Sequence, residues 1–293
     1  MELKLWNKAL VLYNESLKRN ENLSRVKMSK LLEVNEQVAR NIIFALQNKN
    51  IIQYQPSVFD SSDENILVFG DVHIPYQDDL AIEAMLSFAE KENISSIIIL
   101  GDLVDFYQIS TFEKNPKYRS IPEEIKLAKK FLIDLKKRFK CEIILKEGNH
   151  EYRLKRYLLK NAKEIYELVE NILEEKLCAG IVDYRPGFFR IGKLWVLHGH
   201  EKPTGSYNPE YICNVIWRVV HDHFIVAHYH RTQEKVFKNI SGNSFNTAAI
   251  GYLAGDLDYA PLNKWNQGFA IVGFNKKGYF RIRNYKIDNG IVY

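Results

Sequence analysis

Groups of metal-binding side-chain types recur along this chain, and each follows an apolar run that predicts a buried strand. In chain order, the groups are Asp71 with His73, Asp102, Asn149 with His150, His198 with His200, and His228 with His230. An aspartate after a strand is, by itself, more often a turn residue or a helix cap than a metal ligand. The repetition of the pattern at successive strand ends therefore favours one shared site.

The donor types indicate which ions such a site would bind. Carboxylate, amide and imidazole groups suit Mn, Fe, Zn, Co or Ni better than Ca or copper bound by thiolates. One ligand from each turn is too many for a single ion, whereas two ions that share a carboxylate use them all, at the spacing of about 3.5 to 4 Å found in hydrolytic sites. A water molecule between two cations loses a proton near neutral pH and can attack a phosphorus bound across both metals. We expect two divalent ions, with Mn as the first choice.

Alternating strands and helices position the first three groups. Apolar runs at 66–69, 97–100 and 142–145 predict strands, and the segments 79–91 and 122–139 predict helices between them. This βαβαβ order predicts a right-handed parallel sheet, whose carboxyl edge is where such sheets place their chemistry.

The rest of the chain predicts a second sheet. From about Val182 the sequence is mostly strand-like, with little helix. The predicted strands are 188–191, 194–198, 224–228, 245–250, 269–274 and 280–285. A sheet packed on the first one would account for them.

The first fifth of the chain differs in charge. Residues 1–55 carry six Lys and three Arg against five Glu and no Asp, so they hold +4 of the chain's net charge of +5. This excess favours an anionic partner for the N-terminal part, although small helical domains are often basic without binding anything.

The N-terminal part also predicts helices. They cover 3–18 and 24–32, the second with Ser24 as its cap, and a third ends near Asn48. Three helices with a short turn resemble a helix-turn-helix or winged-helix module, in which Arg40 could reach base edges of DNA. The alternative is a helical cap for packing or dimerisation.

Composition limits the cellular setting. The chain is 46% hydrophobic, yet no apolar run is long enough to cross a bilayer, and the charged N-terminus is unlike a signal peptide. Cys141, Cys178 and Cys213 are far apart and form no CxxC pair, which suits reduced thiols. We expect a cytoplasmic protein with no membrane partner.

Five motifs carry a resemblance to a known family. They are Gly70-Asp71-Val72-His73, Gly101-Asp102-Leu103-Val104-Asp105, Gly148-Asn149-His150-Glu151, His198-Gly199-His200 and His228-Tyr229-His230. Over about residues 65–285 these resemble the ordered signature of the calcineurin-like metallophosphoesterases, and GDVHIPY, GDLVDFYQIS and GNHEYRLKRYL are similar to phosphoesterases common in phages and prophages. The resemblance implies a four-layer αββα sandwich. With the N-terminal pattern, we expect a helix-turn-helix-like domain at 1–55, a linker at 56–64 and a metallophosphoesterase domain at 65–293.

The resemblance also implies a role for each motif residue. Asp71, His73 and His230 would hold one metal, Asn149, His198 and His228 the other, and Asp102 would bridge them. His150 would protonate the leaving oxygen, with Asp105 or Glu151 orienting it. In the HGH motif we prefer His198 as the ligand, because the preceding strand delivers it to the sheet edge, and His200 would face the substrate. Ala227 stands where the family usually has glycine.

Other conspicuous residues keep two interpretations. Arg153 and Arg156 could clamp a phosphate or could pair with nearby glutamates. Tyr207, Tyr252 and Trp265 could stack on a base, or could only hold their loops in place.

Together these features predict a hydrolase that uses a metal-bridged hydroxide, with a phosphodiesterase or nuclease acting on nucleic acid or nucleotides as the first choice. One alternative is a phosphomonoesterase for small molecules or proteins, whose N-terminal domain only recruits or dimerises. The other is a non-catalytic DNA-binding regulator. Fe, Zn, Ni and Co remain alternatives to Mn, and the sequence leaves homo-oligomerisation open.

Overall fold

The computed structural model divides the chain into two compact units, Met1–Tyr54 and Gln55–Tyr293. The residues it describes are 8–9, 11–12, 15–16, 24–34, 39, 64–110, 120–169, 171–201, 210–255, 257, 263–275 and 279–293. In the first unit, helix α2 (Arg25–Leu32) begins after Ser24, whose side chain accepts a hydrogen bond from the Lys27 N–H, as expected for a cap. Most of the other two predicted helices, and with them the helix-turn-helix interpretation, lie outside the described residues.

The larger sheet of the second unit contains the predicted parallel strands. Its described strands, in spatial order, are β12 (Ile291–Val292), β11 (Phe280–Asp288), β10 (Gln267–Phe274), β1 (Glu64–Phe69), β2 (Ile94–Ile99), β3 (Glu142–Lys146) and β4 (Asp183–Arg185). Strands β1 to β4 run parallel, and β10 extends the sheet beyond β1 as an antiparallel neighbour, followed by β11. The prediction that 269–274 and 280–285 belong to the second sheet was wrong, because β10 pairs with the edge of β1 that no parallel strand covers. The predicted βαβαβ unit is confirmed, with helices α4 (Asp79–Ala89) and α5 (Ile121–Phe139) in the connections.

The smaller sheet brings the two histidine motifs together. Its described strands are β5 (Phe189–Ile191), β6 (Leu194–Leu197), β7 (Phe224–Val226), β9 (Ser244–Ala249) and β8 (Gln233–Lys238), in that spatial order. Because β6 and β7 are adjacent and parallel, both end at the same edge of the sheet. His198 follows β6, and His228 and His230 follow β7.

Side chains of the central strand β2 alternate between two cores. Ile97 and Ile99 pack on the side covered by α4 and α5, while Ile98 and Leu100 pack against the second sheet. This alternation is what a strand buried on both faces requires.

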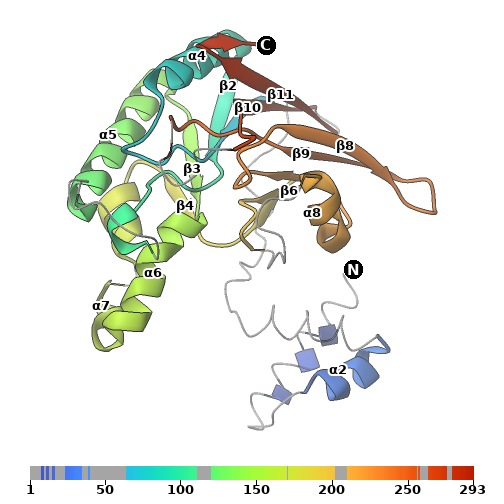
Figure 1. The fold of residues 1–293 in the computed structure, drawn as a ribbon. Coiled ribbons are helices and arrows are strands. Elements are labelled where there is room, and N and C mark those ends of the chain that lie inside the picture. Colours follow the sequence, from blue (N-terminus) through green and yellow to red (C-terminus); the bar gives the residue numbers. More distant parts are fainter. Residues whose placement is uncertain are drawn as a thin grey trace. The chain divides into compact units, whose positions relative to one another are not determined.

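The outer face of the second sheet is covered by helix α8 (Ile212–Val220), which packs Ile212, Cys213 and Ile216 against it. Helices, two sheets and a further helix thus form four layers (Figure 1). The predicted αββα sandwich is confirmed.

Helix α8 was not anticipated by the sequence. Its residues, ICNVIWRVV, are largely apolar and β-branched, so as a short run they resemble a strand. The spacing of its buried residues is nevertheless helical. Within the described residues, no helix combines the length and the apolar character needed to span a bilayer.

Candidate metal centre

The first sheet delivers three ligand turns to one edge. Asp71 and His73 follow β1, Asp102 follows β2, and Asn149 follows β3 and opens helix α6 (Asn149–Asn161). Asp71, His73 and Asp102 each have φ of 51°, in the left-handed region that non-glycine residues rarely adopt. Such strained backbone at successive strand ends is typical of functional sites.

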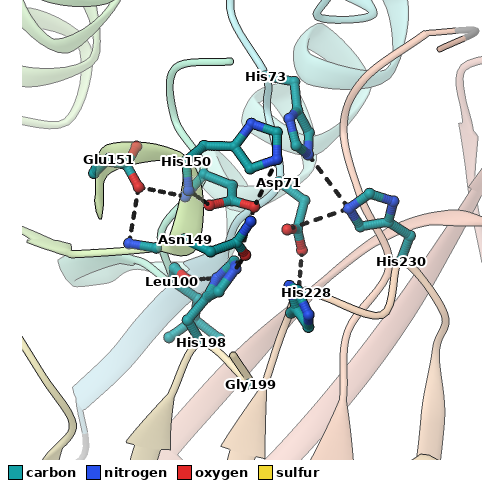
Figure 2. Close-up of polar contacts among 12 residues, drawn as sticks. Asp71, His73, Leu100, Asn149, His150, Glu151, His198, Gly199, His228 and His230 are labelled. Atoms are coloured by element: carbon teal, nitrogen blue, oxygen red, sulfur yellow. Dashed lines mark hydrogen bonds and ion pairs between the residues drawn. The ribbon is translucent and has the colours of Figure 1, made fainter. Parts of the chain in front are cut away.

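The turn after β7 on the second sheet shows the same feature. His228 and His230 have φ of 68° and 55°. Figure 2 shows these histidines and His198 pointing toward the side chains from the first sheet. The structure therefore gathers every residue that the sequence predicted as a metal ligand.

One cluster consists of Asp71, His73 and His230. All three are buried, and their ligand atoms lie within 4.8 Å of one another. Nε2 of His73 is 3.3 Å from Nε2 of His230, which in turn is 3.4 Å from Oδ1 of Asp71. The other carboxylate oxygen of Asp71 accepts a hydrogen bond of 2.8 Å from the His228 N–H, which joins the two histidine turns.

A second cluster consists of Asp102, His198 and His228, whose ligand atoms also lie within 4.8 Å of one another. Nε2 of His198 is 3.2 Å from Oδ2 of Asp102 and 2.9 Å from Oδ1 of Asn149. Asn149 thus places an oxygen beside this cluster. A third group of possible ligands, His73, Asp105 and His150, shares His73 with the first cluster.

The donor atoms of both clusters fit divalent cations. Nδ1 of His198 lies 2.6 Å from the Leu100 carbonyl oxygen and donates its proton there, so Nε2 is the nitrogen that faces the oxygens of Asp102 and Asn149 and that a metal ion would bind in place of a proton. In the first cluster, Oδ1 of Asp71 is buried and accepts no hydrogen bond from any described residue. Lone pairs that converge without donors are stabilised by a metal ion.

The charge state of the two clusters favours the binding of cations. Burial opposes ionisation of Asp71 and Asp102, but nearby imidazoles outweigh it and hold the pKa of both carboxyls below its usual range. Burial lowers the pKa of His198, yet the Asp102 charge raises it to about 9 overall. Burial and then His198 lower the pKa of His228 to about 3, so its imidazole is neutral and one ring nitrogen keeps a lone pair for a metal ion. The carboxylates therefore stay charged and attract cations.

The His150 ring lies between the Asp105 carboxylate and the Arg153 guanidinium. Oδ1 of Asp105 contacts Nδ1 of both His73, at 3.0 Å, and His150, at 3.1 Å. Nη2 of Arg153 lies 2.8 Å from Nε2 of His150. Because a guanidinium only donates, Nε2 accepts and the imidazole proton lies on Nδ1, toward Asp105. Of the two carboxylates considered for orienting His150, Asp105 is the one that contacts its ring.

Glu151 instead holds the backbone of the ligand turns. Its buried carboxylate accepts hydrogen bonds from the N–H groups of Asp102, Leu103, Val104 and Gly148, at 2.8 to 3.2 Å. A Cβ at Gly148 would collide with Asp102 and with Oε2 of Glu151, so only glycine fits there. We call this arrangement the Glu151 clamp.

A second clamp was missed by the sequence. The Glu201 carboxylate accepts hydrogen bonds from the N–H groups of His198, at 3.0 Å, and Gly199, at 2.6 Å. Nζ of the fully buried Lys146 lies 2.6 Å from Oε1 of Glu201. The sequence offered two signals for this clamp. Lys146 ends an otherwise apolar strand, and Glu201 directly follows the His198-Gly199-His200 motif. We call this arrangement the Glu201 clamp.

The remaining predicted residues lie around the clusters. His200 is outside them, with its ring 5.3 Å from that of His198, and burial lowers its pKa to about 4. The rings of Tyr252 and Trp265 lie 5.2 and 4.4 Å from that of His230. Arg156 is exposed, and Tyr207 lies outside the described residues.

The four-layer sandwich and the paired aspartate and histidine clusters define a metal-dependent hydrolase of phosphate esters. The chain belongs to the calcineurin-like phosphoesterases, because the model of that family matches residues 64–267, more than half of its length. The family resemblance seen in the motifs is thereby confirmed.

Individual proteins are more distant. The Gene 54 protein of Mycobacterium phage L5 is 26% identical over 230 residues, which cover 71% of this chain and 88% of that protein. Among solved structures, Vps29 of Entamoeba histolytica in complex with zinc has a TM-score of 0.44 and 16% identity, covering 78% of this chain and 96% of Vps29. The E. coli phosphoesterase YfcE has a TM-score of 0.36 and 11% identity, covering 76% of this chain and all of YfcE.

Proposed function

We propose that this enzyme is a phosphodiesterase that acts on nucleic acid or nucleotides with two divalent cations. The observation that carries the proposal is the pair of clusters, one around Asp71 and one around His198, with Asp102 beside the second. The excess positive charge of residues 1–55 supports a polyanionic substrate.

The two clusters support the two ligand sets that the motifs suggested. Asp71, His73 and His230 would hold one cation, Asn149, His198 and His228 the other, and Asp102 would lie between them. The mixed oxygen and imidazole donors suit Mn, which we propose as the native metal. Bound cations would supply the Lewis acidity that makes water nucleophilic near neutral pH and neutralises charge on phosphoryl oxygens.

The protein's own groups would handle the leaving oxygen. In the structure, Nε2 of His150 accepts a hydrogen bond from Arg153. A substrate phosphate that draws Arg153 away would free Nε2 to take up a proton from solvent. His150, held by Asp105, would then pass this proton to the leaving oxygen as its bond to phosphorus breaks in an in-line displacement. Arg153 would meanwhile stabilise charge on the phosphate.

The test compares the wild-type enzyme with Asp102→Ala in the presence of Mn. We expect the wild type to bind metal and to hydrolyse an aryl phosphodiester and oligonucleotides faster than an aryl phosphomonoester. Asp102→Ala should lose both bound metal, measured by mass spectrometry, and turnover. A second variant, His150→Asn, should keep its metal while kcat falls by about 10² to 10⁴.

Two other results would overturn the proposal. Preference for the phosphomonoester, without cleavage of nucleic acid, would indicate a phosphomonoesterase. Equal and negligible metal binding and turnover in wild type and Asp102→Ala would indicate a non-catalytic regulator.

A further inference from the structure

Helix α6 starts in the metal centre and leaves it. Its first residues, Asn149 and His150, belong to the site, and only His150 and Glu151 of the whole helix are buried. In Figure 1, α6 and the short helix α7 (Tyr166–Val169) extend away from the two sheets. Most of α6 therefore contributes little to the core, although it begins at the reaction centre.

One face of α6 is basic along its length. His150, Arg153, Tyr157 and Lys160 follow one another at spacings of three and four residues, which places them on one side of the helix, with Arg156 beside them. Arg156 and Lys160 are exposed, and Tyr157 is 43% exposed. We call Arg153, Arg156, Tyr157 and Lys160 the α6 face.

The outer part of this face has no acidic partner among the described residues. Within the described parts of the chain, Arg156 and Lys160 form no ion pair. The single acidic residue of α6, Glu151, is turned toward the backbone of the ligand turns. The face therefore offers free cationic groups to an anionic partner.

We propose that the α6 face binds the phosphate backbone of a nucleic acid strand whose scissile phosphate lies at the metal centre. This inference rests on the proposed phosphodiesterase function and specifies its substrate as a polymer. Continuity with the site supports it, because Nη2 of Arg153 lies 2.8 Å from Nε2 of His150, the group placed at the leaving oxygen. The first cation of the face thus adjoins the reaction.

The length of the face favours a strand over a mononucleotide. At a rise of 1.5 Å per residue, Lys160 lies about 15 Å along the helix from His150. A phosphate bound at the metals is out of its reach, whereas further phosphates along a bound strand can lie beside the face. Tyr157 adds a ring on which a base can stack, the usual companion of cations in single-strand binding.

The experiment uses the full chain with two surface changes, Arg156→Gln and Lys160→Gln, combined in one variant. The matched control combines Lys91→Gln and Lys137→Gln, which remove the same charge. Those lysines are exposed near the ends of the helical segments that precede β2 and β3, at the opposite edge of the sheet from the ligand turns. Substrates are an aryl phosphodiester, a dinucleotide, and a hexanucleotide in DNA and RNA forms.

We expect the wild type and the control to hydrolyse the hexanucleotide with a higher kcat/KM than the dinucleotide. The α6 variant should lose most of this gain, roughly 10-fold, through a higher KM, and should retain full activity on the aryl phosphodiester. Its salt dependence on the hexanucleotide should be shallower by about 1.4 in slope, for two lost single-strand contacts. Comparison of DNA with RNA shows which backbone is preferred.

Unchanged KM and salt slope on the hexanucleotide, equal to those of the control, would overturn the α6 inference while oligonucleotide cleavage by wild type upholds the proposed function. Activity of wild type on aryl esters without cleavage of any oligonucleotide would overturn both. Loss of aryl phosphodiesterase activity in the α6 variant alone would show general damage to the site, and would also count against a role in strand binding.

Discussion

Two glutamates hold ligand turns in this enzyme, the fully buried Glu151 for the first sheet and the partly buried Glu201 for the second, and they are stabilised in different ways. The Glu151 clamp relies on four backbone N–H groups, and burial, with the Asp102 charge, raises the pKa of Glu151 to about 7. In the Glu201 clamp, burial opposes ionisation, but the Lys146 charge outweighs it and holds the pKa of Glu201 below its usual range.

The difference lies in where the counter-charge comes from. Glu151 lies beside the anionic Asp102, so it depends on backbone dipoles that the two turns already supply. Glu201 receives a full positive charge from Lys146, which belongs to β3 of the first sheet. The Glu201 clamp thus also links the first sheet to the turn that follows β6 of the second sheet, where Glu201 lies. Loss of the Glu151 clamp should disturb the ligand turns of the first sheet, and loss of the Glu201 clamp should disturb the His198 turn of the second sheet.

The largest effect is expected from Lys146→Met. Without its lysine, the partly buried Glu201 carboxylate loses its ion-pair partner, which costs about 3 kcal/mol in the free energy of unfolding. The double variant Lys146→Met with Glu201→Gln should regain much of this loss. Urea denaturation of the wild type, both single variants and the double variant measures the coupling. A loss below about 1 kcal/mol for Lys146→Met would show that Glu201 needs no cation, and would remove the contrast between the clamps.

Glu151→Gln should destabilise the enzyme by about 2 to 3 kcal/mol. Each carboxylate oxygen accepts from two backbone N–H groups, and the glutamine NH₂ would face one of these pairs with no acceptor. Urea denaturation in the presence of a chelator isolates this structural cost. Glu151→Asp, whose shorter side chain keeps both oxygens, serves as the control for charge. A cost near zero for Glu151→Gln would contradict the clamp.

Glu201→Gln should weaken metal binding selectively. The His198 turn would lose one charged acceptor, and changes to groups that support a ligand typically reduce metal affinity 10- to 100-fold. We expect about a 10-fold loss for one of two Mn ions by titration calorimetry, whereas Glu151→Gln should weaken both ions because its turns carry Asp102 and Asn149. Equal effects of the two variants on both ions would contradict this division.

The smallest effect on the free energy of unfolding is expected from the surface ion pair between Arg138 and Glu83. Arg138 binds Glu83 at 2.8 Å, and hydrogen bonds from Arg138 and Ser87 lower the pKa of Glu83 from 4.5 to about 2, although Glu83 is 60% exposed. Solvent screening limits its worth to about 0.5 kcal/mol. Since the folded-state pKa is lowered, this contribution is complete above pH 4.5 and fades as the pH falls toward 2. The stability difference between wild type and Glu83→Gln should be constant from pH 7 to 5 and should narrow below about pH 4.

Much of the catalytic unit could be predicted because its signals are local. Strands β1, β2 and β3 are continuous apolar runs that end in Gly-Asp or Gly-Asn turns, and the helices between them have clear periodicity. Helix α8 escaped prediction because a nine-residue apolar run has no local feature that separates helix from strand. Its role was decided by packing on the second sheet.

The candidate site also combines features that local sequence patterns predict with features that depend on packing. The motifs identified its ligand residues, since aspartate, asparagine and histidine at strand ends are a local pattern. The contacts of Asp105 with two imidazoles and of Lys146 with Glu201 join residues far apart in the sequence and on different elements. No periodicity or spacing encodes such pairs.

By itself, the sequence determined the family, the order of strands and helices in the parallel unit, and the donor types available for metal, because these depend on side-chain chemistry and on neighbours along the chain. Only the tertiary structure decided which donors share a cluster, which carboxylate holds which turn, and that α6 carries a basic face away from the site. Those features depend on distances between segments, and such distances are set when the two sheets pack against each other.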